Sequence, residues 1–324
     1  MSKILVTGGA GFIGSHVCEA LVNRGDKVIC LDNFTDYYGP DVGYTSDKKV
    51  RNIEDLTDQP NFDLISADIR KASDLETIFA RNQGIDVIIH LAAMAGVRRS
   101  FEIPDDYAAT NINGTRLLLI NANQFDVRNF VFASSSSVYG DNSQVPFREH
   151  QDGLQPISPY AETKLEGEML CRENHGQTGM PITCLRFFTV YGPRGRPDMI
   201  PYKFTRFLFE GKPLPVFGDG TTQRDYTFIN DIVSGIIAAT DRALPFEVIN
   251  LGNSRTVRLI DFIRTLEKLT GRTAQINWQP PQKGDVQRTY ADITKAKELL
   301  GYNPQTPIEE GLRQLVEWYK ESNN

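Results

Sequence analysis

The chain has 324 residues, of which 40% are hydrophobic, so it can bury the cores of a large α/β domain and a smaller lobe. Its net charge of −6 argues against a nucleic acid or an anionic membrane as the main partner. No apolar stretch is long enough for a signal peptide or a membrane span, and the four cysteines lack the spacing of zinc sites or redox pairs. We therefore expect a cytoplasmic protein without metal or disulfides.

Short apolar runs rich in β-branched residues alternate with segments of helical periodicity up to about residue 190. The predicted strands are 3–8, 27–33, 62–68, 86–93, 129–136 and 182–190, and the predicted helices include 12–24 and 158–175. Continuous apolar strands separated by helices indicate a parallel sheet that is covered on both faces. The expected fold class is therefore α/β, with a doubly wound, Rossmann-like parallel sheet and a smaller C-terminal α/β lobe.

Beyond residue 190 the pattern changes to glycine- and proline-rich loops separated by short helices, such as 258–270 and 308–320. A helix at 228–243 and a strand at 246–252 are expected to return to the first domain. We therefore expect a first domain of residues 1–189, rejoined by about 226–252. Residues 190–225 and 253–324 should form the smaller, substrate-binding lobe.

Glycines follow the first predicted strand and open the first predicted helix, in the sequence TGGAGFIG. Gly8, Gly11 and Gly14 permit a tight turn and let backbone amides approach a pyrophosphate, which the helix N-terminus also attracts. Asp32 ends the second strand, where a carboxylate accepts hydrogen bonds from an adenosine ribose and repels a 2′-phosphate. The pattern predicts NAD rather than NADP, and a purely structural glycine turn is the alternative.

Further cofactor contacts are expected along the same edge of the sheet. The third strand ends where the adenine would lie, and the fourth ends in small side chains that let a dinucleotide pass across it. Tight packing of a strand end explains these small residues almost as well. The expected cofactor-lining residues here are Phe12, Ile13, Asn33, Asp68, Ile69, Leu91, Ala92 and Ala93.

Tyr160 and Lys164 in SPYAETK stand four residues apart, on one face of a helix that Ser158 caps and Pro159 starts. A lysine ammonium and a nicotinamide cation would favour phenolate, so we expect a lowered tyrosine pKa that suits a general base. Alone, this pair also fits an ordinary helix surface. The hydroxyls of SSSSVYG at 134–140 end the fifth strand, where such sheets bind ligands, and this favours the catalytic interpretation.

Taken together, TGGAGFIG, Asp32, HLAA, SSSSVYG and YAETK resemble the extended short-chain dehydrogenase/reductase family over essentially the whole chain. The loop RFFTVYGPRGRPDM at 186–199 and the segment DNFTDYY at 32–38 resemble those of UDP-glucuronate 4-epimerases. The resemblance implies an NAD-dependent enzyme that inverts C4 of a UDP-sugar through a 4-keto intermediate. It also implies a homodimer that assembles through the helical segments 104–124 and 158–175.

Residue by residue, the resemblance makes Tyr160 the base, Lys164 a partner of that tyrosine and of the ribose, and Ser135 the hydroxyl nearest the reacting oxygen. Related dehydratases and decarboxylases carry an acidic residue at the position of Ser136, which disfavours both chemistries here. The resemblance adds Thr110 and Phe188 to the cofactor-lining positions. The implied substrate contacts are Arg98, Ser135, Ser136, Ser137, Thr189, Arg196, Phe217, Arg224 and Asp285.

Arg196 matches the subgroup's carboxylate-binding arginine, whereas Arg194 is expected only to face solvent. A 4-keto uronate loses carbon dioxide when its carboxylate aligns with the ketone, so the site must hold that group, and a planar guanidinium suits the task. Met94 stands where the subgroup usually has glutamine. Three alternatives stay open: a 4-epimerase of UDP-glucose or a UDP-N-acetylhexosamine, a UDP-glucuronate decarboxylase, and a noncatalytic NAD-binding module.

Overall fold

The computed structural model describes residues 1–36, 45–141, 144–151, 153–281 and 286–323. Within these residues, seven parallel strands form the central sheet in the order β11-β6-β5-β4-β1-β2-β3. They are β1 (Lys3–Thr7), β2 (Lys27–Asp32), β3 (Phe62–Ser66), β4 (Val87–His90), β5 (Asn129–Ser135), β6 (Ile182–Phe187) and β11 (Phe246–Leu251). The expected doubly wound α/β fold is confirmed.

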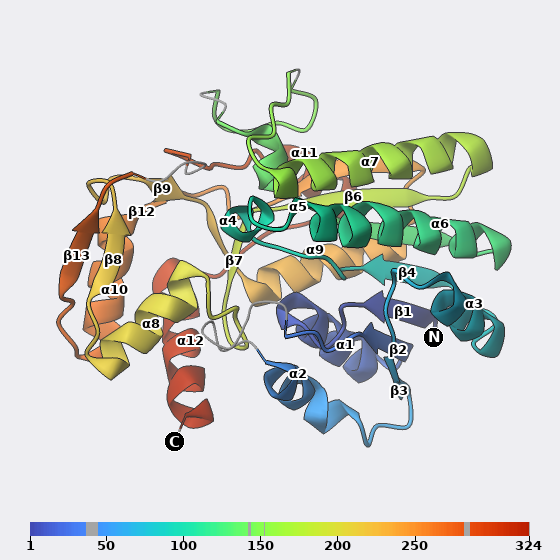
Figure 1. Ribbon diagram of the computed structural model, residues 1–324, viewed down its shortest axis with the longest axis horizontal. Helices are drawn as coiled ribbons and strands as arrows, with labels where there is room; N and C mark the ends of the chain where they lie inside the picture. Colours follow the sequence, from blue (N-terminus) through green and yellow to red (C-terminus); the bar gives the residue numbers. More distant parts are fainter. Residues whose placement is uncertain (37–44, 142–143, 152, 282–285, 324) are drawn as a thin grey trace.

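Helices cover both faces of this sheet (Figure 1). One face carries α1 (Phe12–Arg24), which packs on α9 (Ile229–Arg242) and on α2 (Ser46–Ile53), with η1 (Glu54–Leu56) following. The other face carries α3 (Ala72–Arg81), α6 (Thr115–Gln124) and α7 (Pro159–Thr178), and α6 lies beside α7. Each face has its own cluster of buried apolar side chains, as the continuous apolar strands predict.

The helical segment expected at 104–124 is not one regular helix. It consists of α5 (Pro104–Tyr107), a π-helix η2 (Ala108–Gly114) and α6. The side chain of Asn111, inside the π-helix, accepts from the Met94 N–H at 2.8 Å and donates to the Met94 carbonyl at 2.9 Å. It also donates to Thr163 Oγ1 of α7 at 3.0 Å. The π-helical turn therefore contains the side chain of Asn111, which links it to two other segments. Single π-helical turns of this kind are frequent at functional sites.

The run 182–190, expected as one strand, forms two. Phe188 donates its N–H to the Leu251 carbonyl at 3.0 Å, and Thr189 donates to the Asp225 carbonyl at 3.1 Å. The chain therefore leaves the central sheet at Phe188, and β7 (Thr189–Tyr191) pairs with β10 (Tyr226–Phe228) instead.

The smaller lobe is built from short sheets and helices after β7. Strand β8 (Leu214–Phe217) pairs with β13 (Ile276–Gln279), and β9 (Gln223–Arg224) pairs with β12 (Val257–Arg258). Its helices are α8 (Ile200–Glu210), α10 (Leu259–Thr270) and α12 (Ile308–Ser322), whereas α11 (Thr294–Leu300) packs on α9 and on β11 of the central sheet. The buried cluster on the α1 side continues into this lobe without a break. The domain boundaries drawn from the sequence stay a prediction.

All four cysteines are buried, as expected, and each is a free thiol in this structure. In the part of the chain that the structure describes, no helix has the length and apolar content that a membrane crossing requires. Among the same residues, no three His, Cys, Asp or Glu side chains are grouped so that they could hold a metal ion.

Candidate active site

A cleft of about 650 Å³ runs along the carboxyl ends of the central strands. Parallel strands all end at the same edge, so residues far apart in sequence meet there. Most of the residues predicted from the sequence line this cleft: Gly8, Gly11, Phe12, Ile13, Gly14, Asp32, Asn33, Ile69, Leu91, Ala92, Ala93, Thr110, Ser135, Ser136, Ser137, Tyr160, Lys164, Phe188, Thr189 and Arg196.

The glycine turn at the start of α1 is packed too closely against neighbouring backbone to admit a side chain at Gly8 or Gly14. Gly8 has φ +69°, and a Cβ on it would lie 2.7 Å from the Ala92 nitrogen. A Cβ on Gly14 would lie 2.1 Å from the Gly8 carbonyl oxygen. Gly11 caps the thirteen-residue helix α1 without a side-chain acceptor, so the first amides of α1 are left for a ligand. This geometry fits a pyrophosphate group.

Asp32, at the end of β2, is held firmly. Its carboxylate accepts from the Phe34 N–H at 2.9 Å and from the Ala10 N–H at 3.3 Å. Lys49 Nζ, on α2, lies 3.5 Å from Asp32 Oδ1, and both side chains are buried. The sequence predicts that Asp32 repels a 2′-phosphate. The positive charge of Lys49 beside Asp32 weakens that repulsion.

Asp68 does not line the cleft. Its carboxylate accepts hydrogen bonds from Arg70, from the N–H at 2.9 Å, Nε at 3.0 Å and Nη2 at 2.6 Å, and from Asn33 at 3.4 Å. It is Arg70 that reaches the cleft wall at this end. The adenine contact expected of Asp68 stays a prediction.

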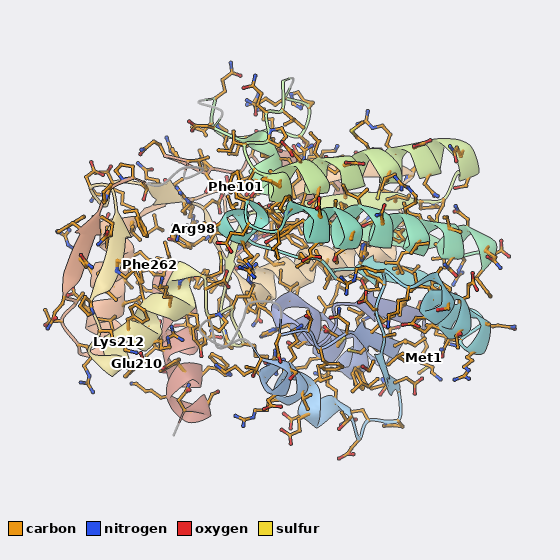
Figure 2. The ribbon with its side chains drawn as sticks, viewed as in Figure 1. Met1, Arg98, Phe101, Glu210, Lys212 and Phe262 are labelled. Atoms are coloured by element: carbon orange, nitrogen blue, oxygen red, sulfur yellow. The ribbon has the colours of Figure 1, made fainter. Side chains whose placement is uncertain are left out.

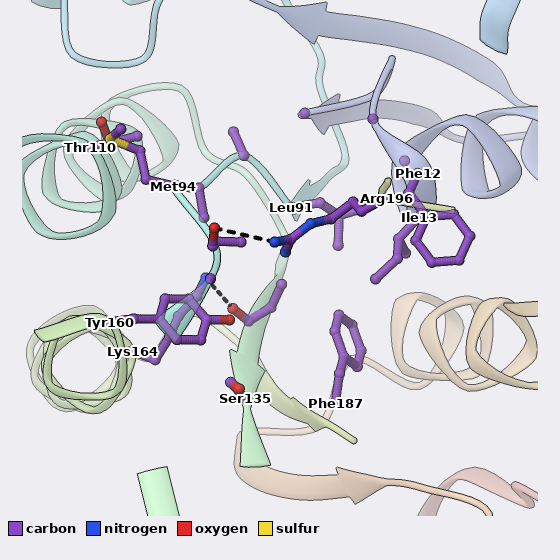
Figure 3. A pocket seen from close by; sticks show the side chains of 18 of the residues that line it. Phe12, Ile13, Leu91, Met94, Thr110, Ser135, Tyr160, Lys164, Phe187 and Arg196 are labelled. Carbon is purple, nitrogen blue, oxygen red and sulfur yellow. Dashed lines mark hydrogen bonds between the residues drawn. The ribbon is translucent and has the colours of Figure 1, made fainter. Parts of the chain in front are cut away.

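Tyr160 and Lys164 lie on one buried face of α7, as the spacing predicts. Ser158 Oγ accepts from the Ala161 N–H at 3.2 Å and so caps α7, and Pro159 is its first residue. Lys164 Nζ donates to the Ala133 carbonyl of β5 at 2.8 Å. Figure 3 shows the phenol of Tyr160 and the hydroxyl of Ser135 in the same cavity.

The acidity of Tyr160 differs from the expectation. Burial raises its pKa, and a hydrogen bond with Ser135 and the charge of Arg196 oppose that rise without cancelling it. The expectation that Lys164 lowers the pKa of Tyr160 is therefore wrong when only the protein's own groups are present. Arg196 is the cation that favours the phenolate. Burial also lowers the pKa of Lys164 to about 8, which weakens its charge.

The four serines at the end of β5 and the start of η3 (Ser136–Tyr139) have different surroundings. Ser134 donates to Glu168 Oε1 at 2.5 Å, and Glu168 forms a buried bidentate ion pair with Arg186 at 2.8 and 2.7 Å. Ser135 Oγ lies 3.2 Å from Ser137 Oγ and accepts from the Ser137 N–H at 3.1 Å, at the start of η3 (Ser136–Tyr139). Ser134 therefore anchors the strand end, and its neighbours present hydroxyls to the cleft.

Arg196 enters the cleft from the side opposite Tyr160 (Figure 3). Its guanidinium donates to both oxygens of Asp198 and, from Nη2, to the Ala95 carbonyl at 3.4 Å. Arg194 behaves differently from the expectation that it faces solvent. It lies 2.8 Å from Glu19 Oε2 of α1, and its side chain is 22% exposed. Its charge thus attaches the loop 192–199 to the first helix.

Two of the residues assigned to the substrate meet beyond the cleft wall. The Arg98 guanidinium, on α4 (Val97–Ser100), lies 4.9 Å from the centre of the Phe217 ring at the end of β8. Figure 2 shows Arg98 where α4 faces the smaller lobe. Arg224 donates to backbone carbonyls at 3.0 and 3.5 Å. Asp285 and the end of the segment 32–38 lie outside the described residues.

Several cleft residues were missed by the sequence reasoning. Some follow strand ends and could have been inferred from that position, whereas those on α2, α4 and the nearby loops have no local signal. They are Leu31, Thr35, Lys49, Ala67, Arg70, Ala95, Gly96, Val97, Arg99, Ile103, Asp106, Ala133, Ser134, Phe187, Val190 and Met199. Met94, which departs from the subgroup pattern, also lines the cleft.

Comparison with known proteins agrees with this geometry. A UDP-glucuronate 4-epimerase of Thermodesulfobacterium geofontis is 42% identical, over 99% of this chain and 97% of its own. The crystal structure of a Bacillus cereus UDP-glucuronic acid 4-epimerase, in complex with UDP-glucuronic acid and NAD, superimposes with a TM-score of 0.91 at 40% identity and covers 99% of both chains. A UDP-glucose 4-epimerase of Thermotoga maritima gives 0.89 at 34% identity, over 99% of this chain and 100% of its own. Residues 5–315 match the family described as GDP-mannose 4,6 dehydratase, and this chain belongs to that family of extended short-chain dehydrogenases/reductases.

Proposed function

We propose that this protein interconverts UDP-glucuronate and UDP-galacturonate by NAD-dependent epimerisation at C4. The observation that carries the proposal is the position of Arg196. It lines the same cleft as Tyr160 and Thr189, and its guanidinium binds a carboxylate in this structure, that of Asp198. The similarity to UDP-glucuronate 4-epimerases over nearly the whole chain supports the same substrate.

The cofactor would lie along the carboxyl edge of the sheet. The tight glycine turn, which lines the cleft, and the start of α1, which no side chain caps, suit its pyrophosphate, and Asp32 suits the adenosine ribose. When bound there, NAD⁺ supplies the acceptor for the hydride of C4.

Tyr160 accepts the proton of the C4 hydroxyl in this proposal. Ser135 hydrogen-bonds the tyrosine and would contact the same substrate oxygen. The positive charge of Arg196 stabilises the phenolate, which offsets part of the effect of burial. Tyr160 returns the proton after the 4-keto sugar has turned its other face to the cofactor, so a single base serves both directions.

Arg196 and Thr189 would hold the carboxylate of the uronate. A fixed carboxylate stays out of alignment with the 4-ketone, which prevents loss of carbon dioxide. Ser136 lines the cleft at the position where decarboxylases and dehydratases of the family carry an acid. This combination supports epimerisation over decarboxylation.

The nucleotide would lie between α4 and the smaller lobe. Arg98 stacked on Phe217 offers a cation beside an aromatic surface, which suits a diphosphate next to a uracil ring. Arg224 and Asp285 are the further contacts that the resemblance implies. In this arrangement residues 190–225 and 253–324 form the substrate lobe.

A homodimer is also proposed. Ile120 on α6 and Met169 on α7 are 52% and 63% exposed, and these helices lie side by side. Such apolar side chains on neighbouring helices suit a helical interface with a second copy. We further propose a cytoplasmic location, because four free buried thiols suit a reducing compartment.

The deciding experiment is incubation of the protein with each UDP-sugar separately, followed by chromatographic resolution of the 4-epimers. UDP-glucuronate should give UDP-galacturonate and no UDP-pentose. A higher kcat/KM for UDP-glucose or a UDP-N-acetylhexosamine would make the protein a sister epimerase. Absence of any turnover with bound NAD⁺ would favour a noncatalytic module.

A further inference from the structure

The guanidinium that the proposed function assigns to the sugar already holds a carboxylate of this chain. Arg196 Nε lies 3.1 Å from Asp198 Oδ1, and Nη2 lies 2.5 Å from Asp198 Oδ2. Both side chains are largely covered, with 17% of Arg196 and 28% of Asp198 exposed. This is the bidentate geometry that a uronate carboxylate would use.

A tight turn keeps the two side chains together. Pro197 separates them, and the Met199 N–H donates to the Arg196 carbonyl at 3.1 Å, which closes a β-turn with proline at its second position. On the other side, the Ala95 carbonyl accepts from Nη2, and a Cβ on Gly96 would come within 3.2 Å of that nitrogen. Asp198 is therefore a fixed neighbour of the guanidinium.

We propose that Asp198 determines the preference among UDP-sugars by acting as the internal counter-ion of Arg196. This inference rests on the proposed function, because it assumes that a uronate carboxylate meets Arg196. When a uronate binds, two carboxylates meet at one guanidinium and repel each other. When a neutral hexose binds, Asp198 balances the charge of Arg196, so the cleft does not contain an uncompensated cation at this point. Asp198 thus lowers the affinity for uronates and keeps neutral sugars acceptable.

The substitution Asp198→Asn tests this inference, because the amide keeps the shape and one acceptor for Arg196 while it removes the charge. Dissociation constants of UDP-glucuronate, UDP-glucose and UDP are measured by calorimetry on NAD-loaded protein. A Tyr160→Phe background prevents turnover. We expect UDP-glucuronate to bind roughly three- to thirtyfold more tightly, from a partly screened repulsion. UDP should change less than about twofold, and UDP-glucose should bind no more tightly than to the parent, because Arg196 is then left without its counter-ion.

The matched control is Glu210→Gln, which removes one negative charge at the far end of α8, where Glu210 pairs with Lys212 (Figure 2). It should leave all three constants unchanged. A second variant, Asp198→Ser, removes the same charge with a different side chain. For each variant we compare the ratio of the dissociation constant of UDP-glucose to that of UDP-glucuronate, because a fold defect that weakens both equally leaves this ratio unchanged. The inference predicts that this ratio rises in both Asp198 variants.

An unchanged or smaller ratio in the Asp198 variants overturns the counter-ion role, and a smaller one would mean that Asp198 only orients Arg196. A ratio that rises equally in Glu210→Gln would also overturn it. Failure of the proposed function is seen separately, in the parent protein, as an inability to epimerise UDP-glucuronate.

Discussion

Replacing Tyr160 with phenylalanine should abolish turnover and leave the site otherwise intact. The ring of Tyr160 packs edge-on against Tyr107, with centroids 6.2 Å apart, and phenylalanine keeps this contact. The loss of the hydroxyl leaves Ser135 with Ser137 as a partner at 3.2 Å, so no hydroxyl is stranded in the interior. We therefore expect a change in unfolding free energy of no more than about 1 kcal/mol.

The catalytic loss should be far larger. Removal of a general base costs roughly a hundredfold to ten-thousandfold, or about 3 to 5 kcal/mol in activation free energy. The upper half of this range is expected, because the neighbouring hydroxyl of Ser135 is a weak base at neutral pH.

The assay follows conversion of UDP-glucuronate in quenched samples and also measures the NAD content and the affinity for UDP. The control Tyr319→Phe removes a phenol of α12 in the smaller lobe and should keep the parental rate. A Tyr160→Phe enzyme within tenfold of the parental kcat would show that another group takes the proton.

Four further outcomes are expected. Arg196→Met should lower kcat/KM for UDP-glucuronate roughly ten- to a hundredfold, because a charge-assisted hydrogen bond is lost and Asp198 is left without its partner. The affinity for UDP should not change. Equal values of kcat/KM for the variant and the parent in steady-state kinetics would contradict this. NAD(H) should copurify with the protein, as its absorbance after denaturation will show, whereas a need for added NAD⁺ would count against the redox-neutral cycle. The double variant Ile120→Glu, Met169→Glu should be monomeric by light scattering, against a dimeric parent. Burial lowers the pKa of His90 to about 3. Below pH 6.5 the unfolded chain therefore binds a proton on this ring, whereas the native protein keeps the ring neutral. Stability to urea should therefore fall between pH 6.5 and 3, and less steeply in His90→Gln.

The sequence predicts the central sheet and much of the cleft well, for a physical reason. Parallel strands buried on both faces appear as continuous apolar runs, and their carboxyl ends must share one edge. Residues such as Asp32, Ser135 and Tyr160, which lie at the end of a strand or the start of a helix, are therefore brought together by the topology alone.

The features that the sequence does not reveal depend on contacts between distant segments. Lys49 approaches Asp32 from a separate helix, and Arg98 meets Phe217 across the two lobes. Asn111, inside the π-helix, binds Met94 and Thr163 at once. Asp198 is close in sequence to Arg196, yet the sequence does not predict which group the side chain of a charged loop residue contacts.

The pairing of strands in the smaller lobe has a consequence for how the protein is made. On the ribosome, the central sheet is complete once β11 emerges, at residue 251. Strand β8, which carries Phe217, must wait for β13 to end at residue 279. Domains fold as units in the order of synthesis, so the nascent chain should close its cofactor half first. For about thirty residues of synthesis it would then be able to recognise a dinucleotide while still lacking a finished place for the nucleotide sugar.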